Sequence, residues 1–336
     1  MSRHLLLIIF VILISDQSHS QQKNNFLSCI SSPVLFRGNE KTAYRDPAVL
    51  YHNNKFYLFF TLVRIEDSGK VFSYTAMSMS EDLKRWSPVK ILTPRNQKLN
   101  YCSPGNVVQY KNEWILCLQT YPRPDYTVDQ MPRFGTGDAR IFILRSTDLQ
   151  NWSTPELIKV KGPDVSENEM GRMIDPYLLE DKDEPGKWWC FYKQNGVSMS
   201  FTYDFRKWTY FGHTESGENA CVLIENNKYV LFHSLKNGIA IKRSADLEHW
   251  QDWGPLITLG QNEWSWAKGR ISAGAVINLK SNPLFGKYIM FFHGSGPLTE
   301  EQGDFDKNAS IGIAWSDDLR YWSWPGKAVK RAKTDF

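Results

Sequence analysis

Three carboxylates stand out in this sequence because each immediately precedes an apolar run. Asp46 lies in YRDPAVLY, Asp175 in MIDPYLLE and Glu218 in SGENACVLIE. An Asp-Pro pair is also an ordinary way to begin a strand, because proline is tolerated at a strand's first residue and aspartate suits the preceding turn. Carboxyl groups held in different protonation states can act as general acid and general base. Such chemistry requires that the fold bring them together.

A phrase ending in tryptophan recurs five times and identifies the elements that must position these carboxylates. The copies are SEDLKRW ending at Trp86, STDLQNW at Trp152, TYDFRKW at Trp208, SADLEHW at Trp250 and SDDLRYW at Trp322. Each follows an alternating stretch such as YTAMSMS, which has the period of a half-buried strand. Upstream of each lie two apolar runs split by a polar turn, a pattern typical of a hairpin.

Four antiparallel strands repeated five times predict an all-β fold, a five-bladed β-propeller with four strands per blade. The phrase marks the turn between a blade's third and fourth strands. Its aspartate is expected to accept N–H bonds in that turn, and its tryptophan to pack against the next blade. The repeated residues therefore describe architecture, and the chemistry must lie elsewhere.

The first strand of each propeller blade lines the central channel, so the residues that open these strands should converge at one end of the axis. Aligning the five openings gives Asp46, Ser103, Asp175, Glu218 and Ser272. Carboxylates that converge in a narrow channel repel one another and must have a use. Two aspartates and a glutamate in such positions favour a functional role over a turn-forming one.

The order of these motifs resembles glycoside hydrolase family 43 and its five-bladed relatives. RDP opens the first blade, SP stands where the family often has Ala-Pro, IDP opens the third blade, and the Glu of GENA opens the fourth. The resemblance implies hydrolysis of glycosidic bonds, with Asp46 as general base, Glu218 as general acid and Asp175 as modulator of the acid's pKa. Glu218 is followed by Asn219 and Ala220, whereas the family usually has Glu-Gly-Pro.

Inverting hydrolysis suits carboxylates on non-adjacent blades, because it needs an acid and a base roughly 6.5–9.5 Å apart. An ionised Asp175 would raise the pKa of Glu218 by like-charge repulsion and keep it protonated near neutral pH. Glu215, three residues earlier, is the alternative acid if the alignment slips. The expected substrates are plant or algal polysaccharide side chains or oligosaccharides of the arabinofuranoside, xyloside or galactoside class, which come from the resemblance alone.

Further side chains near the openings are expected to contact substrate. A guanidinium can bind a sugar hydroxyl or carboxylate, although solvation at the surface is equally compatible with the arginines. The two tryptophans in the long connection into blade five could stack on a sugar face, although packing between blades is the commoner use of tryptophan. The residues expected to bind substrate are Arg45, Ser103, Arg172, Trp264, Trp266 and Arg270.

No metal or other cofactor is expected to be required. His233 and His293 end second strands, and each is expected to be a satisfied core histidine rather than a ligand. Some members of the resembled family bind calcium through water near a blade-five histidine, so a structural calcium is left open.

The first twenty residues are typical of a cleavable secretory signal, with Arg3 and His4 ahead of an apolar run at 5–14. We expect a secreted or periplasmic protein whose residues 21–336 form a single catalytic domain. A net charge of +4 predicts neither nucleic-acid nor membrane binding, which leaves an oligosaccharide or polysaccharide as partner. Five cysteines, three of them inside apolar strand-like runs, do not indicate a disulfide framework.

Other interpretations stay open beside this one. Fructan-cleaving relatives place Asn-Asp-Pro-Asn-Gly in blade one and Arg-Asp-Pro in blade three, an arrangement that this sequence lacks. Anhydrogalactosidase-like propellers share the fold and need not use a glutamate as acid. A propeller that only binds glycans is the alternative of a different class, and it would not require both Asp46 and Glu218.

Overall fold

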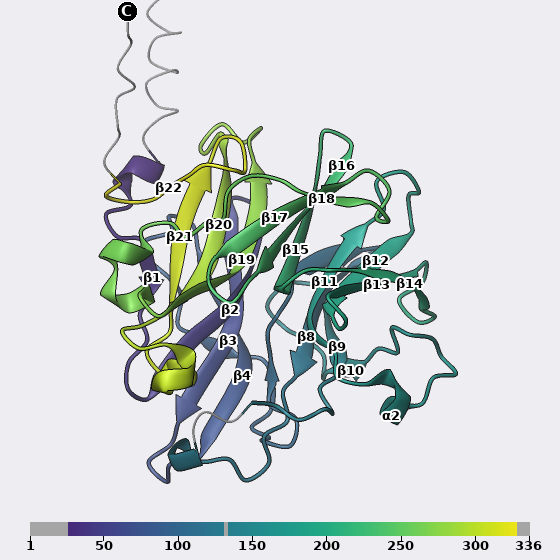
Figure 1. The fold of residues 1–336 in the computed structure, drawn as a ribbon, viewed down its shortest axis with the longest axis horizontal. Coiled ribbons are helices and arrows are strands. Elements are labelled where there is room, and N and C mark those ends of the chain that lie inside the picture. Colours follow the sequence, from purple (N-terminus) through teal and green to yellow (C-terminus); the bar gives the residue numbers. More distant parts are fainter. Residues whose placement is uncertain (1–25, 131–133, 328–336) are drawn as a thin grey trace, which may run out of the picture.

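The computed structural model describes residues 26–130 and 134–327, which form five antiparallel sheets around one axis (Figure 1). The five-bladed β-propeller predicted from the repeats is therefore confirmed. The predicted signal at residues 1–20 lies outside the described residues, so secretion stays a prediction. No helix in the described ranges combines the length and apolar character needed to cross a membrane.

The blades follow the chain in order. Blade one contains β2 (Thr42–His52), β3 (Lys55–Ile65), β4 (Val71–Ser80) and β5 (Lys90–Ile91). Blade two contains β6 (Tyr101–Cys102), β7 (Val107–Tyr110), β8 (Glu113–Thr120), β9 (Ile141–Ser146) and β10 (Glu156–Leu157). Blade three contains β11 (Ile174–Glu180), β12 (Trp188–Lys193), β13 (Val197–Thr202) and β14 (Thr209–Thr214). Blade four contains β15 (Glu218–Glu225), β16 (Lys228–Ser234), β17 (Ile239–Ser244) and β18 (Trp250–Asp252).

Blade five is closed by a strand from the start of the described chain. It contains β19 (Arg270–Leu279), β20 (Lys287–Ser295), β21 (Ser310–Ser316) and β22 (Trp322–Ser323). In addition, β1 (Val34–Phe36) pairs with β21, with Val34 opposite Gly312. The repeats do not predict this contact, which joins the two ends of the propeller and thereby closes the ring.

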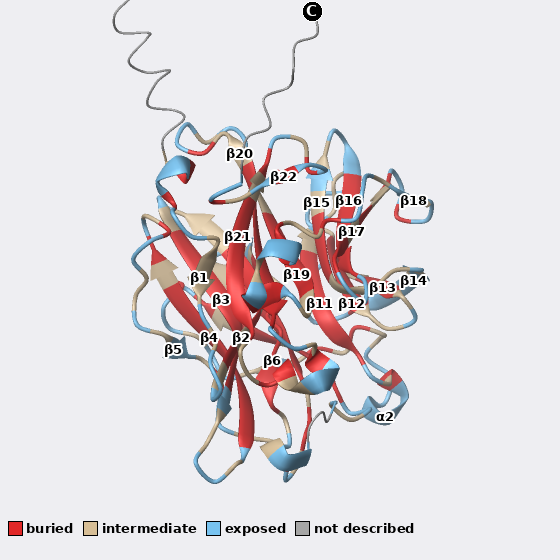
Figure 2. Cartoon of the chain, turned by 60° about the vertical axis from the view of Figure 1, so that its left-hand side comes forward, coloured by how far each residue is buried: buried red, intermediate tan, exposed pale blue. Residues whose placement is uncertain are grey.

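Helical segments are short and lie in the loops. They are the 3₁₀ turns η1 (Leu27–Cys29), η2 (Val128–Gln130), η3 (Gln261–Glu263) and η4 (Ser265–Ala267), the helix α2 (Glu167–Met170) and the π-helical turn η5 (Glu300–Asp304). Buried residues follow the inner strands, and exposed residues follow the outer edges and loops (Figure 2). The described cysteines are all free.

The repeated phrase builds the same turn in every blade. In the first copy, Asp82 Oδ1 accepts hydrogen bonds from the backbone N–H groups of Lys84 and Arg85 at 2.9 and 2.7 Å. Ser80 Oγ accepts from the N–H of Leu83 at 2.8 Å, and Leu83 itself has a positive φ of 58°. The equivalent aspartates are Asp148, Asp204, Asp246 and Asp318. The predicted capping role of these aspartates is confirmed.

The tryptophan of the phrase packs against the preceding blade rather than the next one. The Trp152 ring lies edge-on to Phe59 of β3, with ring centroids 5.5 Å apart. Trp322 of blade five lies edge-on to Phe232 of β16 at 6.3 Å. The sequence correctly predicted that this tryptophan packs between blades. It predicted the wrong neighbour, because the turn folds the ring back toward the preceding sheet.

The first strands surround the axis and share one backbone feature. One residue in each has a positive φ of 41–53°, and these residues are Asp46, Ser103, Asp175, Asn219 and Ala273. In four of the blades the ladder register shifts at this point, as a β-bulge requires. A narrow space of about 30 Å³ lined by all five residues confirms that they meet on the axis.

The bulges correct the alignment of the openings in blades four and five. Asn219 and Ala273, and not Glu218 and Ser272, occupy the position of Asp46. Glu218 therefore stands one residue before the bulge, as Arg45 does in blade one. The apolar pattern of the sequence does not reveal this offset of one residue. The apolar residues that follow the bulge keep the alternation of a strand, whichever of the two preceding residues is taken as the bulged one.

Candidate active site

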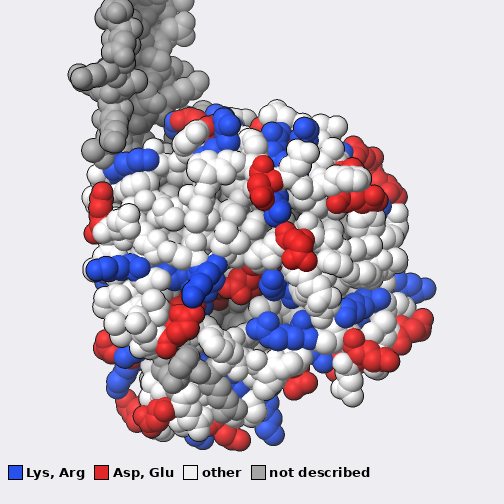
Figure 3. Space-filling model, viewed as in Figure 1, with Lys and Arg blue, Asp and Glu red and all other residues white. Residues whose placement is uncertain are grey.

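A cavity of about 310 Å³ opens on the axis above the bulges, and Asp46, Asp175 and Glu218 all line it. Figure 3 shows acidic side chains inside a hollow on this face, with Lys and Arg side chains around it. The three carboxylates come from β2, β11 and β15, which lie in blades one, three and four. The structure thus brings together residues that are far apart along the chain.

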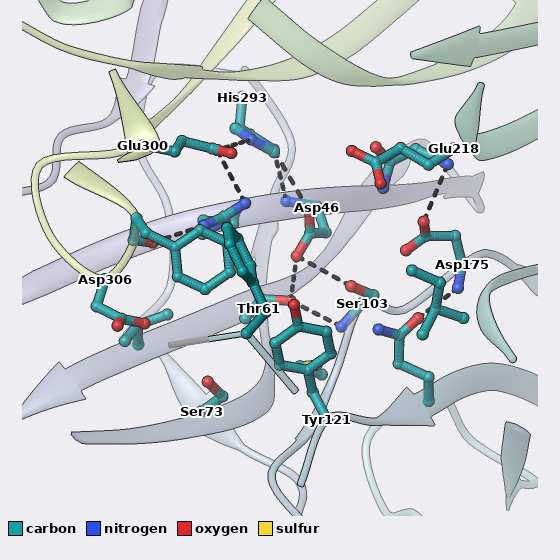
Figure 4. A pocket seen from close by; sticks show the side chains of 18 of the residues that line it. Asp46, Thr61, Ser73, Ser103, Tyr121, Asp175, Glu218, His293, Glu300 and Asp306 are labelled. Atoms are coloured by element: carbon teal, nitrogen blue, oxygen red, sulfur yellow. Dashed lines mark hydrogen bonds and ion pairs between the residues drawn. The ribbon is translucent and has the colours of Figure 1, made fainter. Parts of the chain in front are cut away.

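The carboxylate of Asp46 is oriented by two hydroxyl groups (Figure 4). Thr61 Oγ1 and Ser103 Oγ donate to Asp46 Oδ2 at 2.8 and 3.1 Å. Thr61 Oγ1 also accepts a bond from the Ser103 N–H at 2.7 Å, so its own proton is committed to Asp46. Asp46 Oδ1 accepts no hydrogen bond from the described residues, although His293 Nδ1 lies 3.5 Å away, so this oxygen can still contact a water molecule in the cavity.

His293 holds the backbone of Asp46 through a hydrogen bond. The backbone N–H of Asp46 donates to His293 Nδ1 at 3.1 Å, so the ring proton lies on Nε2. Nε2 lies 2.9 Å from Ser272 Oγ and 3.5 Å from Glu300 Oε1. With 1% of its surface exposed, His293 is the satisfied core histidine that the sequence predicts.

A chain of ion pairs links two expected substrate-binding arginines to Glu218. Arg45 Nη2 donates to Glu300 Oε1 at 2.9 Å, and Arg270 Nη1 donates to Glu300 Oε2 at 2.7 Å. Arg270 Nη2 in turn donates to Glu218 Oε1. Burial opposes ionisation of Glu300, but the positive charge of Arg45 and its other neighbours outweighs it and holds the pKa of Glu300 well below its usual range.

Arg45 lines the cavity, but its guanidinium is held by protein groups, and its contact with substrate stays a prediction. Besides Glu300, it bonds to the carbonyl oxygen of Phe305 and lies 4.3 Å from the centre of that ring. Only 8% of Arg45 is exposed. Its position thus fixes the loop that carries Glu300, and direct binding of a sugar would require these contacts to break.

Asp175 is the carboxyl group that holds a proton near neutral pH. Burial, followed by the negative charges of Glu218 and Asp46, raises the pKa of Asp175 to about 8. Its Oδ2 accepts a bond from the Asn219 N–H at 3.1 Å. The expected distribution of charge is therefore reversed: Asp175 is protonated, and Glu218 is the carboxylate paired with Arg270.

The other predicted residues divide between the cavity and the core. Ser103 and the exposed Arg172 line the cavity, and the Arg172 guanidinium lies 5.7 Å from the ring centre of Tyr121. Trp264 and Trp266 do not line it. They stack on each other with centroids 5.1 Å apart and on Phe292 of β20, so packing against blade five accounts for them, and they form no sugar platform at this cavity.

Glu215 is absent from the lining of the axial cavity and lies instead in a neighbouring groove. The alternative assignment of the acid to Glu215 therefore loses its geometric basis. Glu218 remains the candidate for the general acid. It lines both the axial cavity and the neighbouring groove, and 34% of its side chain is exposed.

Sequence reasoning missed the side chains that the loop between β20 and β21 supplies. Glu300 pairs with two arginines, and Asp306 accepts two bonds from Arg123 Nη1, each of 2.8 Å. Tyr126 also donates to Asp306 at 2.7 Å, and the Arg123 and Asp306 side chains are each 1% exposed. Nothing in the residue pattern marks this loop, since its partners are distant in sequence.

The described residues contain no group of three or more His, Cys, Asp or Glu side chains placed to hold a metal ion. At the blade-five histidine, both ring nitrogens already contact protein groups. This donor set does not fit a calcium ion held directly by the protein, and we derive no chemical step through a metal.

No family model matches the sequence, and the search of curated proteins found no match. Solved structures nevertheless share the fold. A family-43 β-xylosidase/α-arabinofuranosidase from a compost microbial metagenome, in complex with xylotriose, superposes with a TM-score of 0.56 at 13% identity over 89% of this chain and 99% of its own.

Two further neighbours give the same result. The catalytic domain of a family-62 α-L-arabinofuranosidase from Coprinopsis cinerea has a TM-score of 0.58 at 15% identity, covering 83% of this chain and 96% of its own. A family-43 enzyme from Xanthomonas citri, complexed with xylotriose, has a TM-score of 0.55 at 13% identity, covering 92% and 95%. The predicted likeness to family-43 propellers is confirmed at the level of the fold.

Proposed function

We propose that this protein is a glycoside hydrolase in which Asp46 is the general base, Glu218 the general acid and Asp175 the group that sets the protonation of Glu218. The observation that carries the proposal is the meeting of these three carboxyl groups in one axial cavity, where burial and the neighbouring carboxylates raise the pKa of Asp175 to about 8. Carboxyl groups whose environments differ in this way can divide the roles of acid and base.

The base is the better prepared of the two catalytic groups. The hydroxyls of Thr61 and Ser103 fix Asp46 through Oδ2, which leaves Oδ1 to take a proton from an attacking water. Because Asp46 and Glu218 come from non-adjacent blades, water has room between substrate and base, and we propose inversion at the anomeric carbon.

The acid must acquire a proton before it can act. In this structure Arg270 pairs with Glu218, and Asp175 carries the proton. We propose that the leaving oxygen of a bound substrate displaces Arg270 from Glu218. Loss of that positive charge makes the Glu218 carboxylate a stronger base than before, so the proton moves from Asp175 to Glu218 and then to the leaving oxygen.

The proposed substrates are oligosaccharides or polysaccharide side chains of plant or algal origin, of the arabinofuranoside, xyloside or galactoside class. The names of the structural neighbours support the xyloside and arabinofuranoside part of this range, since they include a β-xylosidase, an α-L-arabinofuranosidase and an exo-arabinanase. The galactoside class rests on the sequence resemblance alone. An anhydrogalactosidase-like activity fits the same fold. Cleavage outside the cytoplasm, in a secreted or periplasmic location, is proposed from the signal-like residues 1–20.

Binding of glycans without hydrolysis is the second candidate, and one observation favours it. The proposed acid, Glu218, is paired with the Arg270 guanidinium, an arrangement that a site which only recognises hydroxyl groups would allow. The two candidate functions differ in whether the glycan is cleaved, because a binding protein leaves it intact.

The test is a screen of the purified protein against plant and algal oligosaccharides, with product anomers followed by NMR. Hydrolysis with initial inversion supports the proposal. Glu218→Gln should abolish this hydrolysis, whereas Glu248→Gln, the same change at an exposed glutamate of blade four that lines neither the cavity nor the neighbouring groove, should retain it. If the wild type cleaves nothing and calorimetry detects glycan binding, the binding candidate replaces the proposal.

A further inference from the structure

A second groove, of about 750 Å³, lies beside the axial cavity against blades three and four. Glu218, Lys236 and Arg270 line both spaces, so the groove meets the cavity at the proposed acid. A ligand unit in this groove would therefore lie next to the bond that Glu218 is proposed to protonate.

The groove contains buried donors that have no partner. His233 is 3% exposed, and its Nδ1 accepts the Gly217 N–H at 2.9 Å, so the ring proton lies on Nε2. Burial, followed by the positive charge of Lys242, lowers the pKa of His233 to about 4, and the ring is therefore neutral at neutral pH. Neither His233 Nε2 nor the buried Ser216 Oγ has a hydrogen-bond partner in the described structure. A buried donor left in this way favours a ligand that supplies an acceptor.

Positive charge accompanies these donors. Lys236 has no hydrogen-bond or ion-pair partner among the described residues, and Lys193 Nζ contacts only the neutral carbonyl oxygen of Ser216 at 3.1 Å. Lys242, in contrast, is neutralised by Asp252 at 3.1 Å. The groove also contains Glu215, an exposed acid without an ion pair in the described ranges, so the two lysines exceed it by one charge.

We propose that this groove is a subsite for a sugar unit that carries an anionic group, a carboxylate or a sulfate, on the substrate of the proposed hydrolase. An anionic oxygen accepts from a neutral imidazole N–H and a hydroxyl and neutralises ammonium groups, whereas a neutral sugar hydroxyl satisfies only the hydrogen bonds. This inference rests on the proposed function, because only a hydrolase would bind the sugar here as part of its substrate. Binding of the sugar in the groove does not itself require hydrolysis.

The experiment compares the affinity of the intact protein for galacturonate, galactose 6-sulfate and galactose by NMR titration at low salt. The three sugars differ only at C6. We expect at least one anionic sugar to bind about tenfold more tightly than galactose, the ratio that one hydrogen bond to a charged group supplies. Whichever anionic sugar binds more tightly identifies the group that the subsite prefers.

Two variants locate the binding. Lys193→Gln and Lys236→Gln should each reduce the preference for the anionic sugar, whereas Lys228→Gln should not, because Lys228 is an exposed lysine that does not line the groove. Equal affinity for all three sugars, or a preference that survives both substitutions, overturns the proposal. A protein that hydrolyses nothing but shows the lysine-dependent preference loses the proposed hydrolase function and retains the subsite.

Discussion

Replacement of Asp175 by asparagine tests the charge distribution of the cavity. Asparagine cannot ionise, but its side-chain oxygen can still accept the Asn219 N–H that Asp175 accepts at 3.1 Å. The positive φ of 53° at this position suits asparagine, and Asn219 adopts the same value at the equivalent site of blade four. The substitution therefore removes a titrating group with little other disturbance.

The magnitude follows from the raised pKa of Asp175. The folded protein binds this proton up to about pH 8, whereas the unfolded chain releases it near the ordinary value of 3.8. Between these limits the folded state holds the extra proton, so wild-type stability falls as the pH rises. At about 1.36 kcal/mol per pH unit, the roughly four units between 3.8 and 8 give the Asp175→Asn variant a relative gain of at most about 6 kcal/mol.

The assay is denaturant unfolding of both proteins from pH 5 to pH 8.5. The free energy of unfolding of the variant minus that of the wild type should rise with pH and level off above about pH 8. Asp129→Asn is the matched control, because Asp129 is exposed and does not line the cavity. A difference that stays constant, or that falls as the pH rises, would show that Asp175 is already ionised at neutral pH and would refute the reversed charge assignment.

Three further substitutions test the parts that hold the site together. Asp306→Asn leaves the Arg123 guanidinium buried without its carboxylate, so urea denaturation should show a loss of about 3–5 kcal/mol, and a loss near zero would contradict this role. Ser103→Ala removes a 3.1 Å bond to Asp46, and we expect hydrolysis to fall up to about tenfold with little change in melting temperature; unchanged kinetics would mean that Ser103 does not orient the base. Asp246→Ala removes the acceptor of two turn N–H groups and should cost about 1 kcal/mol, measured by the same unfolding assay.

The propeller could be predicted from the sequence because each blade repeats its own local chemistry. Asp82 and Ser80 satisfy the turn through neighbours within three residues, so the phrase alone specifies the turn. Convergence of Asp46 and Asp175 on the axis follows from their position at the start of inner strands. Such information is local to each blade, and five copies made it unambiguous.

Features set by distant contacts could not be predicted in the same way. Glu300 reaches Arg45 across 255 positions of sequence, and its location depends on the path of a loop that no periodicity describes. The ion pair between Arg270 and Glu218 likewise joins blades four and five and reverses the expected charges. The role of Trp264 was ambiguous for a different reason. Its residue type suits both stacking on a sugar and packing in a core, and only the contacts in the folded protein decide between the two.

The most direct test of the central claim is the rate of hydrolysis by Asp46→Asn on the best substrate found for the wild type. The substitution preserves the shape of the side chain, and asparagine tolerates the positive φ of 46° at this position. We predict a loss of about 10²–10⁴-fold, the contribution of a general base, with a nearly unchanged melting temperature. Turnover at the wild-type rate would contradict the account, because the axial carboxylates would then not be the groups that cleave the glycosidic bond.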